Sequence, residues 1–287
     1  MLAIKEILFP FDFSERCYSA APFAGAMACR FGARLTLLSV AQPFYYNAMG
    51  EAGQFINVEE IVRGLKLDLD NALTQEFANL KVARVAEFGE PAEAIADYAH
   101  THGTDLIMMP THGYGRFRTL LLGSVTAKVL HDAACPVWTD AHMKEPASPH
   151  SPGQCSKILC AIDLTERSLR AIAYAAEFAE TWGATLRLAH IVPASEVRPE
   201  KYLSTDLVET LSEMAREQIA KLQHEARTKA EVSIASGDIA QEVREAALEQ
   251  QADLIVIGRG VVRERLGRLR TQAYSIIRES PCPVLSV

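Results

Sequence analysis

Short apolar runs alternate along the chain with longer segments in which apolar residues recur at helical spacing. Short runs bounded by turn residues are typical of buried strands, whereas the longer segments favour amphipathic helices. Strands that alternate with helices indicate βαβ units, and right-handed crossovers between them produce a doubly wound parallel sheet. We therefore predict an α/β protein with five-stranded parallel sheets, whose ligands bind at the carboxyl ends of the strands.

In the first half of the chain this pattern predicts strands at Ile4–Phe9, Leu35–Val40, Val82–Phe88, Asp105–Met109 and Cys135–Thr139. The helices predicted between them cover Glu15–Arg30, Ile56–Leu80, Pro91–His102 and Ala127–Ala133. Ser14 is expected to cap the first of these helices and Gly32 to end it, while Pro91 suits a first helical turn.

The second half repeats the plan. Its predicted strands are Lys157–Ile162, Thr185–Ile191, Glu231–Ala235, Asp253–Gly258 and Pro283–Val287. A strongly helical stretch at Asp206–Lys229 takes the place of the second helix of the first half.

The repetition extends to the residues themselves, and the matching segments keep their order. The pairs are Ile7–Arg16 with Ile158–Arg167, Phe31–Val40 with Trp182–Ile191, and Cys135–Val137 with Cys282–Val284. Such ordered self-similarity indicates one duplicated domain. We place the first domain at 1–141 and the second at 156–287. The segment 142–155, which contains three prolines, is the expected linker.

Composition limits the classes of partner. A formal charge of −7 argues against broad nucleic-acid binding, which requires a basic surface. No apolar run approaches a membrane span and the N-terminus lacks a signal-peptide pattern, so we expect a cytoplasmic protein without a membrane partner. The six cysteines form no Cys-x-x-Cys pair and are interpreted as structural thiols. A zinc site at His142, His150 and Cys155 is a weaker alternative, because its spacing matches no familiar pattern.

The candidate chemistry lies in Met109–Thr126, which follows a predicted strand and leads into a predicted helix. Its glycines would let the backbone approach a ligand closely, and free amides at a helix start point at an anion. Arg116 and Arg118 could add positive charge, or belong to a solvated loop. This stretch is the expected phosphate site.

These residues resemble the universal stress protein family in its tandem two-domain form. The first half has Pro110-Thr-His-Gly113, nine residues (Tyr114 to Leu122), then Gly123-Ser124, close to the Gly-x-x-Gly-x9-Gly-Ser loop of the ATP-binding branch. The resemblance covers both copies and implies an adenine nucleotide α-hydrolase-like fold. It also implies that the last strands, Val137–Thr139 and Val284–Val287, pair the two domains about a pseudo-two-fold axis.

The resemblance further implies that the first domain binds ATP or a related adenine nucleotide, with Mg²⁺ or Mn²⁺ as the accompanying cation. Carried over position by position, the expected nucleotide-binding residues are Pro10, Asp12, Val40, Met109, Pro110, His112, Gly113, Gly123, Ser124, Val125 and Thr126. Pro110 departs from the pattern, since the family has glycine there. Proline fixes φ near −65° and removes an N–H that could face the ligand.

The second copy departs further, because its loop is one residue shorter and arginine replaces the glycine of Gly-Ser. The candidate ligand residues there are Asp163, Ile191, Gly258, Gly260, Arg270 and Thr271. Arginine forks could form a different anion site. The favoured interpretation is a degenerate copy whose arginines form salt bridges or a solvated face. His190 could touch a ligand, although a structural role is favoured.

We therefore expect a stress-response protein that binds nucleotide as a regulatory or interaction module, with protein partners that the sequence does not identify. Homodimerisation stays open. No catalytic residue is assigned, because Asp12 and Asp163 each lack a second motif carboxylate. An interaction scaffold that binds no nucleotide is the alternative. An ATP-hydrolysing enzyme is less favoured, and a slow ATPase is the most turnover that we expect.

Overall fold

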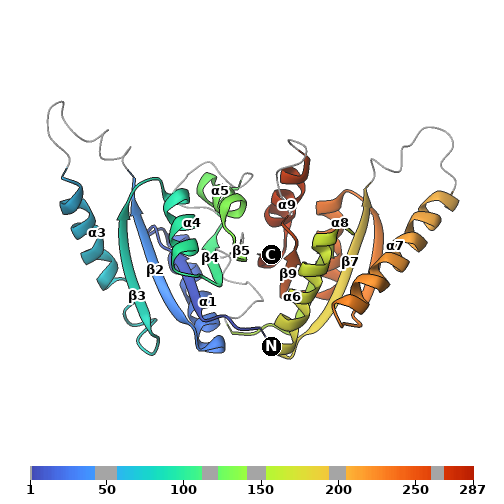
Figure 1. Cartoon of the computed structure of the whole chain (residues 1–287), viewed down its shortest axis with the longest axis horizontal. Helices are drawn as coiled ribbons and strands as arrows, with labels where there is room; N and C mark the ends of the chain where they lie inside the picture. The colour runs from blue at the N-terminus through green and yellow to red at the C-terminus, as the bar shows by residue number, and fades with distance from the viewer. Residues whose placement is uncertain (1, 43–56, 112–121, 141–152, 194–204, 260–267) are drawn as a thin grey trace. The chain divides into compact units, whose positions relative to one another are not determined.

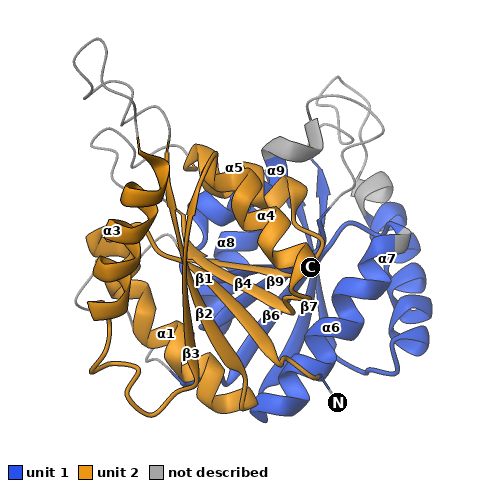
Figure 2. Ribbon diagram, turned by 60° about the vertical axis from the view of Figure 1, so that its left-hand side comes forward, with its two compact units in different colours: residues 1–2, 148–287 blue, residues 3–147 orange. Residues whose placement is uncertain are grey.

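The computed structural model describes residues 2–42, 57–111, 122–140, 153–193, 205–259 and 268–287. The chain divides into an N-terminal unit, Ala3–Ala147, and a C-terminal unit, Ser148–Val287 together with Met1–Leu2. Figures 1 and 2 show these units as successive α/β folds along the chain.

The N-terminal unit contains a parallel sheet with the strand order β3-β2-β1-β4-β5. Its strands are β1 (Glu6–Pro10), β2 (Arg34–Ala41), β3 (Val82–Phe88), β4 (Leu106–Pro110) and β5 (Val137–Asp140). Its described helices are α1 (Glu15–Phe31), α3 (Val58–Asn71), α4 (Pro91–Thr101) and α5 (Ser124–Asp132). Helix α4 packs against α5, while α1 and α3 lie on the other face of the sheet (Figure 2).

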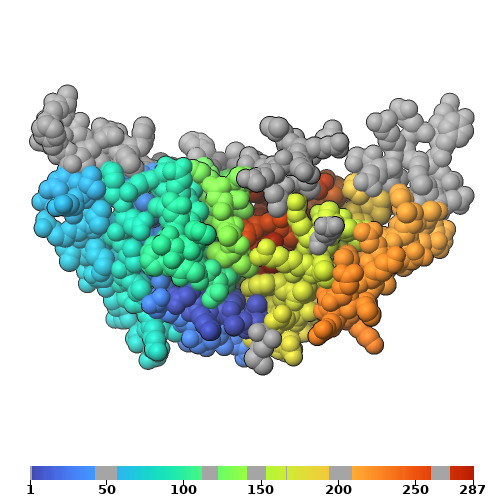
Figure 3. Space-filling view, in the orientation of Figure 1, coloured from blue at the N-terminus to red at the C-terminus, as the bar shows by residue number. Residues whose placement is uncertain are grey.

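The C-terminal unit has the same topology, with the strand order β10-β9-β6-β7-β8. Its strands are β6 (Lys157–Ile162), β7 (Thr185–Pro193), β8 (Glu231–Gly237), β9 (Leu254–Ile257) and β10 (Val284–Ser286). Its described helices are α6 (Glu166–Trp182), α7 (Thr205–Glu225), α8 (Ile239–Gln250) and α9 (Arg268–Glu279). Helix α6 packs against α7, and α8 packs against α9. The outer face of α7, orange in Figure 3, is exposed.

The ten predicted strands are confirmed, each within two residues at either end. The central strands are buried on both faces, which explains their nearly continuous apolar sequences. The predicted caps are also confirmed: Ser14 accepts from the Cys17 amide, Gly32 has the left-handed φ of 63°, and Pro91 begins α4.

The predicted helix Ile56–Leu80 is wrong in its second part, because α3 ends at Asn71. Ala72 is extended and Leu73 has a φ of 53°, so the helix cannot continue. The Arg84 guanidinium, from β3, donates to the carbonyls of Leu69 and Ala72, both over 3.0 Å. A side chain from a later strand therefore fixes the end of this helix.

Candidate functional site

The strand order of the N-terminal unit reverses between β1 and β4, because β2 and β3 lie beyond β1 while β5 lies beyond β4. Ligands of doubly wound sheets bind outside the carboxyl ends of the strands at such a point. Pro10 is the last residue of β1, and Met109 and Pro110 are the last two of β4. Val40 stands near the end of the neighbouring strand β2. The structure thus brings these four predicted site residues to one edge of the sheet.

Helix α5 begins at the same edge. Its N-cap is Gly123, whose amide donates to the Thr111 carbonyl over 2.9 Å. The Thr126 hydroxyl, in the first turn, donates to the Pro110 carbonyl over 3.1 Å. These two hydrogen bonds fix the helix start against the end of β4. Within the described residues no side chain caps α5, so no described side-chain oxygen accepts from the first-turn amides of Ser124, Val125 and Thr126.

Pro110 fits this arrangement as a strand residue. It pairs in register with Asp140 of β5, and Thr111 donates through its amide and its hydroxyl to the Asp140 carbonyl, both over 3.2 Å. The carbonyl of Pro110 accepts the Thr126 hydroxyl. Proline at this position therefore lies in extended backbone that its fixed φ permits.

Asp12 lies in a strained turn that both units share. Phe13, which follows it, has a φ of 60°, and Leu164, which follows Asp163, also has a φ of 60°. Such values are uncommon for bulky side chains. The carboxylate Oδ1 of each aspartate accepts the backbone amide two residues on, over 2.9 Å from Ser14 and 3.1 Å from Thr165. Each aspartate therefore stabilises the turn that leads into α1 or α6.

The thiol of Cys17 lies beneath the Asp12 turn, 3.7 Å from the Pro10 carbonyl. Burial raises the pKa of this thiol far above its usual range, and the charge of Asp12 raises it further. A protonated thiol is a poor nucleophile, so Cys17 serves as packing. None of the six cysteines, all of which lie in the described residues, forms a disulfide.

Several predicted residues lie outside the described parts of the chain: His112, Gly113 and Gly260, with Arg116 and Arg118. The backbone of Arg270 and Thr271 belongs to the first turn of α9, but their side chains are not described. Of the weaker zinc alternative, His142 and His150 are also outside. Cys155 is described, and burial raises its pKa to about 12, whereas zinc binds the thiolate. Among the described residues no group of three metal-ligating side chains occurs.

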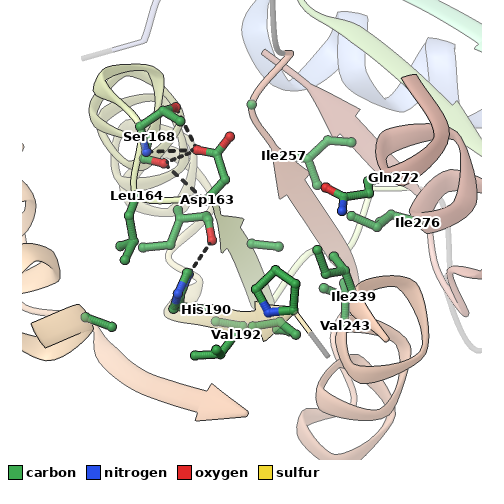
Figure 4. A pocket seen from close by; sticks show the side chains of 18 of the residues that line it. Asp163, Leu164, Ser168, His190, Val192, Ile239, Val243, Ile257, Gln272 and Ile276 are labelled. Carbon is green, nitrogen blue, oxygen red and sulfur yellow. Dashed lines mark hydrogen bonds between the residues drawn. The ribbon is translucent and has the colours of Figure 1, made fainter. Parts of the chain in front are cut away.

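A cavity of about 540 Å³ opens at the corresponding edge of the C-terminal unit (Figure 4). Its walls come from the carboxyl ends of β6, β7 and β9 and from helices α6 to α9, and most of the lining residues are apolar. Asp163, Ile191 and Gly258, three predicted residues of the second copy, line it. Its polar lining residues are Asp163, Thr165, Ser168, His190, Gln218 and Gln272.

Most of these polar groups already bond to protein. Oδ1 of Asp163 accepts from the Thr165 hydroxyl over 2.7 Å and from the Ser168 hydroxyl over 2.8 Å (Figure 4). The amide nitrogen of Gln218 donates to the Leu164 carbonyl over 2.7 Å. Most of the polar groups that line the cavity therefore already have hydrogen-bond partners within the protein.

His190 lies near the end of β7. The sequence left two roles open for it, a ligand contact and a structural residue, and its position is compatible with both. Its Nδ1 lies 3.0 Å from the Ile162 carbonyl, and the residue is 9% exposed and lines the cavity (Figure 4). Because a carbonyl only accepts, Nδ1 carries the hydrogen. The sequence did not identify Gln218, Met214 or Gln272 as candidates, since α7 and α9 bring them to this edge only in the folded unit.

Two doubly wound parallel domains, each with an edge where the strand order reverses, define a tandem α/β protein. The family model described as Universal stress protein family matches the chain twice, over residues 3–139 and 155–287. The chain therefore belongs to the universal stress protein family, in its tandem two-domain form.

Individual relatives agree with this assignment. A universal stress protein of Methanocaldococcus jannaschii is 31% identical over 153 residues, covering 46% of this chain and 92% of that protein. One of Thermus aquaticus is 33% identical over 141 residues, covering 46% of this chain and 96% of that protein. The crystal structure of a universal stress protein from Archaeoglobus fulgidus has a TM-score of 0.67 at 21% identity, covering 98% of this chain and 95% of that one, and supports the fold.

No helix in the described ranges is both long and apolar enough to cross a membrane.

Proposed function

We propose that the N-terminal unit binds ATP or a related adenine nucleotide, and that binding regulates how this stress protein presents itself to partners. The observation that carries the proposal is the start of α5. No described side chain caps its first-turn amides, and they lie at the end of β4 where the strand order reverses. A helix start at this place favours a phosphate group.

The neighbouring residues suit the rest of such a ligand. Gly123 has no side chain to occupy the space in front of α5, and Ser124 is exposed and carries a hydroxyl there. Family membership supports the same ligand, since the loop resembles that of the ATP-binding branch. Binding rather than turnover is proposed, because no described residue near α5 forms a nucleophile and base pair.

A divalent cation would arrive with the nucleotide. Mg²⁺ is usually held by phosphate oxygens, waters and one or two carboxylates rather than by a full protein cage. Asp12 provides one carboxylate near the end of β1, and Oδ1 of that carboxylate already accepts the Ser14 amide. This donor set fits a cation bound mainly by the nucleotide, and Mn²⁺ would be held in the same way.

The test is a calorimetric titration of the full chain with ATP and Mg²⁺, combined with native mass spectrometry. We expect one nucleotide per chain. Gly123→Arg, which introduces the residue of the second copy, should abolish binding because its side chain fills the phosphate space. Gly64→Arg is the matched control: it adds the same charge at an exposed position of α3, where an added Cβ would meet no atom within 4 Å.

If Gly123→Arg binds ATP as tightly as the parent, the proposed pocket is wrong. No binding at millimolar ATP by a folded parent protein would favour the interaction scaffold instead. Steady release of ADP or AMP at enzymatic rates would favour an ATP-hydrolysing enzyme.

A further inference from the structure

We propose that the cavity of the C-terminal unit binds an uncharged, largely apolar small molecule that donates a hydrogen bond to Nε2 of His190. This site is distinct from the nucleotide site proposed for the N-terminal unit, and it does not depend on that proposal. Three observations carry it: the size and lining of the cavity, its charge, and the hydrogen-bonding state of its polar groups.

The size and lining suit an organic ligand. At about 540 Å³ the cavity is within the range of pockets that enclose small molecules, which are mainly apolar with a few polar groups. Its apolar wall includes Ile162, Ile257 and Ile276, which are almost fully buried in the unit. Met214 of α7 lines the cavity and is 62% exposed, so its flexible thioether borders both ligand and solvent.

The described lining residues carry a single charge, and it is negative. Among the described lining residues there is no lysine or arginine, and the single charged side chain is the Asp163 carboxylate. A phosphate or carboxylate placed here would face this negative charge with no cation in the described wall to offset it. The described wall therefore differs from the N-terminal edge, where α5 has no side-chain cap from a described residue and favours an anion.

The hydrogen bonds among the polar lining residues indicate which of these residues can bond to a ligand. Asp163, Thr165 and Ser168 bond to one another, and the Gln218 amide nitrogen bonds to Leu164. His190 donates through Nδ1 to the Ile162 carbonyl, so in the neutral imidazole Nε2 is an acceptor. Within the described parts of the chain Nε2 makes no hydrogen bond. A donor on the ligand would pair with this nitrogen, which belongs to a residue that lines the cavity.

Three naphthalenes test the proposal, because they differ only in the group that meets His190. 2-Naphthol is neutral and donates a hydrogen bond, 2-methoxynaphthalene is neutral without a donor, and 2-naphthoate is an anion. Each is titrated at pH 7 into the full chain carrying Gly123→Arg, with naphthalene fluorescence and calorimetry as readouts. We expect 2-naphthol to bind once per chain. The methoxy compound should bind about tenfold more weakly, since it lacks the hydrogen bond, and the naphthoate at least as weakly.

Variants then locate the site. His190→Phe keeps an aromatic ring and removes the acceptor, and should reduce 2-naphthol affinity to that of the methoxy compound. His190→Ser introduces the residue type that the first copy has at the matching position, Ser39, and should have the same effect. His224→Phe is the matched control, because His224 lies on α7, is exposed and does not line this cavity. Thermal unfolding identifies any His190 variant that fails to fold. In that case the comparison of the three ligands on the Gly123→Arg chain with His190 intact decides.

Equal affinity for 2-naphthol and 2-naphthoate would overturn the proposed selectivity, as would equal affinity for the methoxy compound. Displacement of 2-naphthol by ATP from the Gly123→Arg chain would show that the cavity is a nucleotide site, and would also overturn the proposal. Neither result alters the test of the N-terminal site, whose readout is ATP stoichiometry in the parent chain.

Discussion

The Ser168 hydroxyl donates a 2.8 Å hydrogen bond to Oδ1 of Asp163, in the turn that joins β6 to α6. Ser168 is 2% exposed, and its oxygen also accepts the Asp163 amide over 3.2 Å. The corresponding residue of the N-terminal unit is Cys17, whose thiol lies 3.7 Å from the Pro10 carbonyl and also interacts with Asp12. The two copies thus place a hydroxyl and a thiol at the same position of one strained turn.

Ser168→Ala is expected to lower the free energy of unfolding by about 1–2 kcal/mol, because a buried hydroxyl bonded to a carboxylate is lost. Ser168→Cys, which copies the N-terminal unit, should recover part of this loss. Urea unfolding provides the measurement. Ser19→Ala is the control, since that hydroxyl bonds the Glu15 carbonyl on the exposed side of α1. A Ser168→Ala loss no larger than that of Ser19→Ala would contradict the prediction.

Pro110→Gly tests whether the departure from the family loop weakens nucleotide binding. Pro110 lies in extended backbone opposite Asp140, and only its carbonyl is used, by Thr126. Glycine should therefore leave ATP affinity within about twofold while lowering stability by about 1 kcal/mol, because it increases the freedom of the unfolded chain. Calorimetric titration and urea unfolding measure the two effects. A large gain in ATP affinity would show that the proline does restrict the loop.

Strands and caps could be predicted from the sequence because their causes are local. A strand that is buried on both faces has a nearly continuous apolar sequence. Ser14 and Gly32 cap α1 through hydrogen bonds to residues a few positions away. The end of α3 could not be predicted in this way. It depends on the left-handed Leu73 and on Arg84, which reaches back from β3. The apolar spacing beyond Asn71 continues because Phe77 is buried against α1 in a non-helical turn.

Candidate site residues could be assigned from the sequence only where they belong to a recognisable motif. The end of β4 and the start of α5 are adjacent in a recognisable loop, so the Pro110 and Gly123 region stood out in the sequence. The cavity of the C-terminal unit has no such motif. His190, Met214 and Gln272 come from three separate elements, and only the fold brings them to one cavity.

Arg84→Met should destabilise the protein by about 1–3 kcal/mol, because the carbonyls of Leu69 and Ala72 lose their donors in a half-buried setting. Arg84→Lys should recover little, since one ammonium does not reproduce a planar fork that reaches both carbonyls. Urea unfolding checks the loss, and hydrogen exchange at the last turn of α3 checks its location. Unchanged exchange there would show that Arg84 does not determine the helix end.

Gly25 is expected to resist substitution because α1 packs closely on the turn after α3. A Cβ at Gly25 would lie 3.1 Å from the ring of Phe77, which is 3% exposed. Gly25→Val should cost about 1–3 kcal/mol through overpacking. Gly64→Ala, on the exposed side of α3 with open space around it, should instead stabilise the protein by up to about 1 kcal/mol. Equal effects of the two variants in urea unfolding would contradict the packing argument.

Glu87 gives the stability of the N-terminal unit a defined pH dependence. Burial on β3 raises the pKa of its carboxyl, the charge of His102 lowers it, and Asp97 raises it. A folded-state pKa above the unfolded value means that the folded state holds the proton to higher pH. The contribution of Glu87 to the free energy of unfolding is therefore favourable below the unfolded-state pKa and is lost as the pH rises through the folded-state pKa.

Glu87→Gln removes this titration while keeping the shape of the side chain. The variant should have a higher Tm than the parent at pH 7, where the parent carries a partly buried charge, and the gain should shrink towards zero at pH 4. Thermal unfolding across this pH range makes the measurement, with Glu76→Gln as an exposed control. A Tm difference that stays constant with pH would mean that something other than the charge of Glu87 causes it, because an uncharged contact does not titrate.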